Sequence, residues 1–144
     1  MKYYSYFIIS IFLFFSACVG VSSQTNKNFK NTENTIAIKD LTARDHEMMD
    51  AGSQLEDALE DTIARSVFIV TRENTKYVLK YKVLNYRKGR ALSKSTLEVK
   101  AALYDEGDMV GAWTVNAWVR GAKAKLFQKV ADRIMGHLRG DDGF

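Results

Sequence analysis

Two spacings of apolar residues divide the chain into predicted helices and strands. Apolar residues three and four positions apart predict a helix that starts at Thr42 or Asp45 and ends near Arg65, and a second helix over residues 122–138. Alternating apolar and polar residues, with one short apolar run, predict strands between and before them. These strands cover residues 35–42, 67–70, 77–86, 95–104 and 109–119.

The three longer strands each place apolar residues on one side of the predicted sheet. The predicted inward-facing residues are Tyr77, Leu79, Tyr81, Val83, Leu97, Val99, Ala101, Leu103, Trp113, Val115, Ala117 and Val119. A sheet with one apolar face and two one-sided helices is covered best when both helices lie on that face. We therefore predict an α+β two-layer sandwich in the order β-α-β-β-β-β-α, with a mostly antiparallel sheet of about five strands.

Turn residues separate these strands. Arg87-Lys88-Gly89-Arg90 forms a loop, and Asp105-Glu106-Gly107-Asp108 closes a hairpin. The link over residues 73–76 permits either a hairpin or a short crossover, so the order of the strands stays open.

The first residues have the pattern of an export signal. Lys2 precedes an apolar run from Phe7 to Phe15, and the small residues Ser16 and Ala17 follow, then Cys18. The apolar segment is shorter than the roughly 20 residues that an α-helix needs to span a bilayer. The alternative is a marginal membrane anchor in which Cys18 is a small apolar residue.

Phe15-Ser16-Ala17-Cys18 resembles the lipobox of bacterial lipoproteins, with Phe15 where leucine is usual. The resemblance implies that residues 1–17 are a signal peptide, cleaved before Cys18, and that the Cys18 thiol carries a lipid. Val19, in place of the aspartate of inner-membrane lipoproteins, implies the bacterial outer membrane with the domain facing the periplasm. Residues 18–34 are then a lipidated cysteine, which the resemblance implies, and a flexible tether, which the polar composition predicts. The resemblance also makes residues 35–140 a periplasmic domain, followed by a tail over 141–144.

Catalytic and cofactor motifs are missing from the sequence. His46 and His137 lie in different predicted helices, and neither belongs to a zinc-peptidase motif. No serine has a nucleophile-elbow sequence around it, and the glycines are too scattered for a phosphate-binding loop. A net charge of +4 is too small to indicate nucleic acid. We expect neither an enzyme, nor a cofactor or metal site, nor a nucleic-acid partner.

Charge is distributed unevenly along the chain. Residues 46–65 contain six acidic residues and one basic residue, whereas residues 66–92 contain seven basic residues and one acidic residue. The second segment and the last strand supply a candidate interaction surface. Its residues are Lys80, Lys82, Tyr86, Arg87, Lys88, Arg90 and Trp118.

The alternative is an ordinary solvated sheet face that carries Lys80, Lys82, Glu98 and Lys100. Trp118 argues against that alternative, because a tryptophan on a polar face often marks a contact. A shift of one residue in the register of the last strand would bury Trp118 and remove this argument.

The layout of the domain resembles the superfamily of CsgG-like curli-secretion and LpoB-like envelope lipoproteins. The resemblance lies in TIAIKDLT (35–42), in a helix and strand that end at Arg72-Glu73, and in TLEVKAALYDEGDMVGAW (96–113). It implies a non-enzymatic accessory lipoprotein. The helix that usually separates the second and third strands is absent, as are long pore-forming insertions, so no secretion pore is expected.

Three functions fit these observations. The first is a membrane-anchored accessory module that binds an envelope protein. The second is a binding module for an anionic envelope ligand, lipopolysaccharide or peptidoglycan. The third is a periplasmic inhibitor or immunity lipoprotein, which the sequence does not separate from the first.

Overall fold

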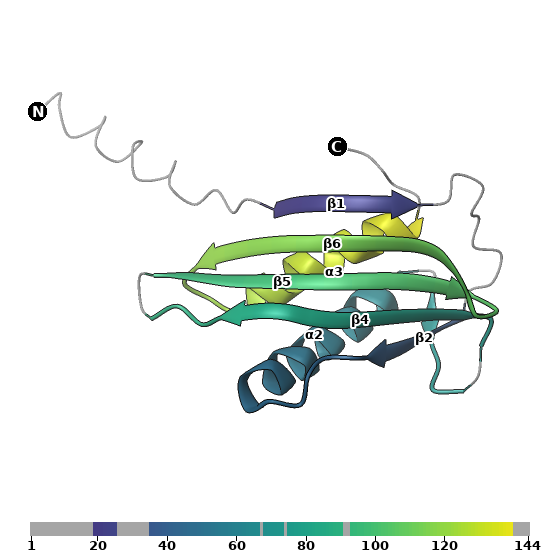
Figure 1. The fold of residues 1–144 in the computed structure, drawn as a ribbon, viewed down its shortest axis with the longest axis horizontal. Coiled ribbons are helices and arrows are strands. Elements are labelled where there is room, and N and C mark those ends of the chain that lie inside the picture. Colours follow the sequence, from purple (N-terminus) through teal and green to yellow (C-terminus); the bar gives the residue numbers. More distant parts are fainter. Residues whose placement is uncertain (1–18, 26–34, 67, 74, 91–92, 140–144) are drawn as a thin grey trace, which may run out of the picture.

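The computed structural model describes residues 19–25, 35–66, 68–73, 75–90 and 93–139. Their strands form one sheet, and two helices pack against it (Figure 1). The elements are β1 (Val19–Thr25), β2 (Thr35–Asp40), α2 (His46–Ala64), β3 (Ile69–Val70), β4 (Tyr77–Arg87), β5 (Lys94–Asp105), β6 (Asp108–Arg120) and α3 (Ala124–Arg139).

Both helices lie on the same face of the sheet, behind the strands in Figure 1. The strands follow the order β1-β6-β5-β4-β2-β3, and the pairs β1–β6, β6–β5 and β5–β4 are antiparallel. From β2 to α3 the elements appear in the predicted order, so the α+β two-layer fold is confirmed.

Strand β2 lies between β3 and β4 and is parallel to both. The link from β3 to β4 is therefore a short crossover past the start of β2, and not a hairpin. The Thr71 N–H donates to the carbonyl oxygen of Ile36 at 3.0 Å, and the hydroxyls of Thr35 and Thr75 lie 3.1 Å apart. These contacts fix the link across the start of β2.

Strand β1 corrects one prediction. The sequence assigned residues 19–25 to a flexible tether, whereas these residues pair with β6 along the edge of the sheet, from Val19 opposite Ala117 to Thr25 opposite Gly111. Strand pairing uses backbone N–H and C=O groups and occupies an edge that would otherwise be unpaired. A strand of this kind needs no run of apolar residues, which is why the sequence pattern did not reveal it.

The core between the sheet and the helices contains the residues that the alternation placed inward. All of the predicted inward-facing residues of β4, β5 and β6 are buried. They meet a stripe of α2 and a stripe of α3, whose buried members are Ala51, Leu55, Leu59, Ile63, Leu126, Phe127, Val130, Ala131, Ile134, Met135 and Leu138. The three long strands therefore present the predicted side chains to the core, and only the end of β4, after Val83, departs from the predicted alternation.

The start of α2 is tied to the sheet by polar contacts. Asp45 caps the helix, because its side chain accepts a hydrogen bond from the Met48 N–H at 3.0 Å. The buried Tyr81 hydroxyl donates to the carbonyl oxygen of Gly52 at 2.9 Å. Burial, and then the carboxylates of Asp40 and Glu56, raise the pKa of Tyr81, so the hydroxyl stays protonated and remains a donor.

The hairpin predicted at Asp105–Asp108 is present. Asp105 and Asp108 close it, and the two residues between them have positive φ angles, 48° for Glu106 and 95° for Gly107. Two residues with positive φ make the tight turn whose twist matches that of antiparallel strands.

Candidate interaction surface

The face of the sheet opposite the helices carries a concentration of positive charge. We call this surface the open face. Among the described residues of β2, β4, β5 and β6, seven basic side chains and one carboxylate, that of Glu98, alternate with the core residues. The basic residues are Lys39, Lys80, Lys82, Arg87, Lys94, Lys100 and Arg120.

Six of these cations stand directly opposite one another in neighbouring strands. Lys39 pairs with Lys80 across β2 and β4, and Lys82 pairs with Lys100 across β4 and β5. Lys94 pairs with Arg120 across β5 and β6. Like charges directly opposite each other destabilise a sheet, by up to about 1 kcal/mol a pair on the scale of cross-strand interactions. A solvated face with mixed charges would avoid this arrangement.

Two aromatic rings on the open face hold lysine side chains. The Lys80 Nζ lies 4.0 Å from the centroid of the Tyr104 ring, and the Lys94 Nζ lies 4.2 Å from that of the Trp118 ring. At these distances the rings attract the ammonium groups. The contacts hold the two lysines close to the sheet.

Trp118 borders a shallow hollow of about 270 Å³ on the open face. The hollow is lined by a row of polar side chains from three strands, Asn85, Glu98 and Asn116. Thr96, which lies opposite Trp118 on β5, and Leu97 and Ala117 complete the lining. Trp118 is half-buried on this side, so the register that the sequence predicted for β6 holds. Amide, hydroxyl and carboxylate groups beside an indole provide hydrogen-bond donors and acceptors next to an apolar surface.

The open face brings together four of the predicted surface residues. Lys80, Lys82, Arg87 and Trp118 all point to this side, and Arg87 lies opposite Thr96, the residue that also pairs with Trp118. The open face therefore extends across four strands, further than the sequence indicated.

Tyr86 is not part of the open face, which corrects the prediction. The pairing of β4 with β5 is irregular between Val83 and Asn85, so Tyr86 lies opposite the buried Leu97. An extra residue in one strand reverses which side the following side chains face. The centroids of the Tyr86 ring and the Phe127 ring on α3 lie 5.6 Å apart. Burial raises the pKa of the Tyr86 hydroxyl.

Lys88 and Arg90 are also separated from the open face. Lys88 lies beside Lys123 at the start of α3, where the contact with Lys88, followed by desolvation, lowers the pKa of Lys123. Arg90 lies in the loop after β4, where its N–H donates to the Ser93 hydroxyl at 2.6 Å. The predicted patch of seven residues is therefore divided between two faces and a loop.

Four cations of the open face were not among the predicted site residues. They are Lys39, Lys94, Lys100 and Arg120. The alternation placed Lys100 outward, but the pairing of strands far apart in the sequence is needed to show that these residues adjoin Lys80 and Lys82. Their shared signal is a basic residue at outward positions in four successive strands of the sheet.

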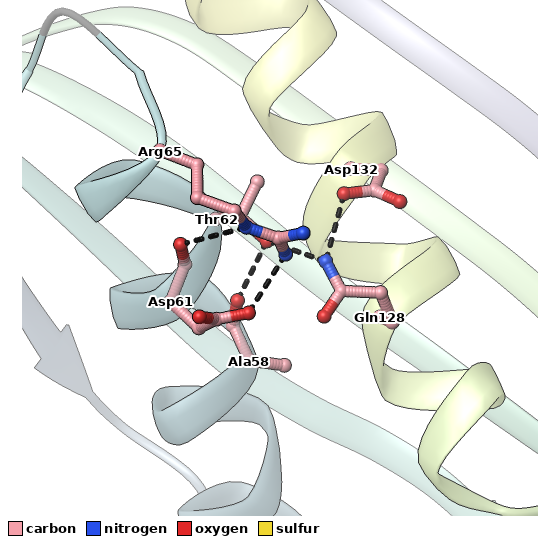
Figure 2. Close-up of polar contacts among 6 residues, drawn as sticks. All are labelled: Ala58, Asp61, Thr62, Arg65, Gln128 and Asp132. Carbon is pink, nitrogen blue, oxygen red and sulfur yellow. Dashed lines mark hydrogen bonds and ion pairs between the residues drawn. The ribbon is translucent and has the colours of Figure 1, made fainter.

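The opposite face is closed by contacts between α2 and α3 (Figure 2). The Gln128 side chain of α3 donates to the Thr62 hydroxyl of α2 at 2.7 Å and to the Asp132 carboxylate at 2.9 Å. Near it, Arg65 and Asp61 form an ion pair at 2.7 Å at the end of α2. The hydrogen bond from Gln128 to Thr62 holds the two helices together above the core.

The described residues contain no group of three or more histidine, cysteine or acidic side chains placed to bind a metal ion. None of the helices built from these residues is long and apolar enough to cross a membrane. Cys18 and the predicted cleavage motif Phe15-Ser16-Ala17 lie outside the described residues.

No protein-family model and no curated protein sequence matches the chain. Solved structures do. The PelC dodecamer from Paraburkholderia phytofirmans has a TM-score of 0.69 at 15% identity, over 85% of this chain and 98% of that one. A hypothetical protein from Chlamydia trachomatis has a TM-score of 0.54 at 9% identity, over 75% of this chain and 99% of that one.

A minor lipoprotein from Acinetobacter baumannii shares the fold with a TM-score of 0.50 at 14% identity, over 75% of this chain and 92% of that one. Identities this low establish the fold alone. The chain thus has a fold that is found in a bacterial lipoprotein, as the sequence resemblance implied. Membership of the CsgG-like and LpoB-like superfamily stays a prediction.

Proposed function

We propose that the protein is a non-catalytic bacterial lipoprotein whose folded domain binds another protein of the cell envelope through the open face. The observation that carries this proposal is the set of three like-charged pairs, Lys39–Lys80, Lys82–Lys100 and Lys94–Arg120. Two of these pairs, Lys82–Lys100 and Lys94–Arg120, join antiparallel strands, where like charges directly opposite each other cost stability in the isolated domain. An acidic partner surface would turn that cost into attraction and would speed up the encounter.

The anchor in this proposal is a lipid on Cys18, which places the domain at the outer membrane on its periplasmic side. The lipobox sequence supports this location. The fold shared with the Acinetobacter lipoprotein is consistent with it. PelC, which shares the fold over nearly its whole length, is a dodecamer, so a domain with this fold can form contacts between protein chains.

The test compares two variants of equal charge change in the native host. Lys82→Glu/Lys100→Glu alters the open face, and Lys125→Glu/Lys129→Glu alters α3 on the other side of the molecule. Proteins bound to each tagged variant are identified after detergent extraction at low salt. We expect the amount of partner recovered with the open-face variant to fall at least tenfold and the amount recovered with the α3 variant to stay unchanged. Equal capture by both variants would contradict the proposal.

A second candidate function is binding of an anionic envelope polymer, lipopolysaccharide or peptidoglycan. The hollow beside Trp118 favours it, because Asn85, Asn116 and Glu98 offer hydrogen bonds next to an indole, with Arg87 and Lys94 close by. This candidate predicts that the detergent-solubilised protein binds the polymer at low salt and releases it at high salt, since salt screens exposed charges. Absence of binding at low salt would remove it.

A further inference from the structure

Two surfaces of opposite charge lie on opposite sides of the domain. The open face is basic, whereas α2, from His46 to Ala64, carries six carboxylates and no lysine or arginine. Because α2 covers the other side of the sheet, its outer surface points away from the open face (Figure 1). The two surfaces therefore do not meet within one molecule.

The carboxylates of α2 are accessible. Glu47, Asp50, Asp57 and Asp61 are exposed, and Arg65 pairs with Asp61. Among the described residues, no ion pair involves the other three. Glu56 and Glu60 add charge to the same helix and are half-buried. Burial, and then the neighbouring carboxylates of Glu60, Asp40 and Asp57, raise the pKa of Glu56, as expected where negative charges are crowded.

We propose that the open face of one molecule binds the acidic outer surface of α2 of a second copy. This inference rests on the proposed function, in which the open face binds a protein, and it identifies that protein as the same chain. Pairing two open faces, or two α2 surfaces, would bring like charges together. Only the head-to-tail contact matches basic with acidic residues, and it leaves one surface of each kind free on every pair.

The sizes of the two surfaces are compatible. A helix of the length of α2, 19 residues, extends about 28 Å at 1.5 Å per residue. Strands of 11 to 13 residues, the lengths of β4 to β6, extend about 36 to 44 Å at 3.3 to 3.4 Å per residue. The helix therefore fits within the open face. A head-to-tail contact repeats from copy to copy and gives a closed ring, or an open filament if the rotation does not close.

The test exchanges charge between the two surfaces. Lys82→Glu/Lys100→Glu places two carboxylates at the centre of the open face, and Asp50→Lys/Asp57→Lys places two ammonium groups on the exposed surface of α2. The full lipidated protein and each variant are measured by native mass spectrometry from non-ionic detergent micelles at low salt. We expect the wild-type protein to form complexes of several copies. Each variant alone should form at least tenfold fewer complexes, because its substituted positions meet like charges on the other surface.

An equimolar mixture of the two variants should recover the complexes with equal numbers of each. In the mixture, the introduced carboxylates of one variant meet the introduced ammonium groups of the other. Lys125→Glu/Lys129→Glu, with the same charge change on α3, should assemble as the wild type does. Wild-type protein that stays monomeric, variants that assemble alone, or a mixture that stays monomeric would each overturn the inference. If the wild type is monomeric and still loses an envelope partner through Lys82→Glu/Lys100→Glu, the proposed function stands while the inference fails.

Discussion

Gly111 lies on the core side of β6, where the indole of Trp113 leaves no room for a side chain. A Cβ atom at position 111 would lie 2.8 Å from Cζ2 of Trp113. The Trp113 ring is buried and stacks on His137 with centroids 5.4 Å apart, so it has little freedom to move. Glycine inside a strand often marks a close approach of this kind.

We predict that Gly111→Ala lowers the free energy of unfolding by about 1 to 3 kcal/mol, the usual cost of overpacking a core. Denaturant unfolding of the wild type and the variant measures it. Trp113→Phe provides the control, because a phenyl ring lacks the Cζ2 atom that is closest to position 111. Gly111→Ala should therefore cost less in the Trp113→Phe background, and an equal cost in both backgrounds would contradict the proposed contact.

Lys100 shows a conflict between stability and binding at the residue scale. It is exposed and lies directly opposite Lys82. We predict that Lys100→Glu raises the free energy of unfolding by about 0.2 to 1 kcal/mol, because it replaces a like-charged pair with an ion pair. Thermal unfolding at low salt should show a gain of a few degrees that shrinks at high salt.

The same Lys100→Glu change should weaken binding of the partner. A variant that is more stable and binds less well is the result expected if the basic residues serve contact rather than folding. Unchanged or lower stability would show that the Lys82–Lys100 pair carries no cost, and the main support for the proposed surface would be lost.

At the scale of elements, the crowded carboxylates of α2 lower the stability of the folded state. Burial, followed by repulsion from Glu60, Asp40 and Asp57, raises the pKa of Glu56 above its ordinary value of 4.5, although Arg72 opposes the shift. The folded state then holds this proton more tightly than the unfolded state does. The ionised side chain therefore destabilises the fold, and the loss of stability grows as the pH rises from the unfolded pKa through the folded one.

We predict that Glu56→Gln raises the melting temperature at pH 7 and that the gain disappears as the pH falls below the ordinary value of 4.5, where Glu56 is neutral in both states. Thermal unfolding across this pH range measures the effect. Glu73→Gln, which removes an exposed carboxylate outside the helix, is the control. A gain that persisted unchanged at low pH would mean that the amide acts by packing or hydrogen bonding and not through charge.

The sequence predicted the elements that depend on periodicity and missed those that depend on pairing. Alternation was enough to place the core residues of β4, β5 and β6 and to place Trp118 on the open face. It did not predict the irregularity between Val83 and Asn85 that turns Tyr86 inward, although two consecutive apolar residues, Val83 and Leu84, break the alternation there.

Other features depend on contacts between distant parts of the chain, which no local pattern contains. The position of β2 between β3 and β4 is one, and the pairing of β1 with β6 is another. The six opposed cations of the open face are a third, because each was visible in the sequence but its partner was not.

At the scale of the whole molecule, the domain has one closed face and one open face. The helices and their bridge through Gln128 and Thr62 cover the first, and the second carries seven cations and Trp118. Strand β1 begins at Val19, the residue after Cys18. A lipid on Cys18, as the lipobox resemblance predicts, would therefore attach next to the edge of the sheet and would hold the domain close to the membrane.

The central claim is that the open face is the surface through which the protein contacts its partner. Site-specific photo-cross-linking in host cells tests it most directly, with a photoreactive residue in place of Asn116 on the open face or of Arg133 on α3. Both positions are exposed, so the two cross-linking sites differ only in the face of the domain on which they lie. The account predicts cross-linked protein from position 116 and little from position 133. Cross-links from position 133, with none from position 116, would contradict it.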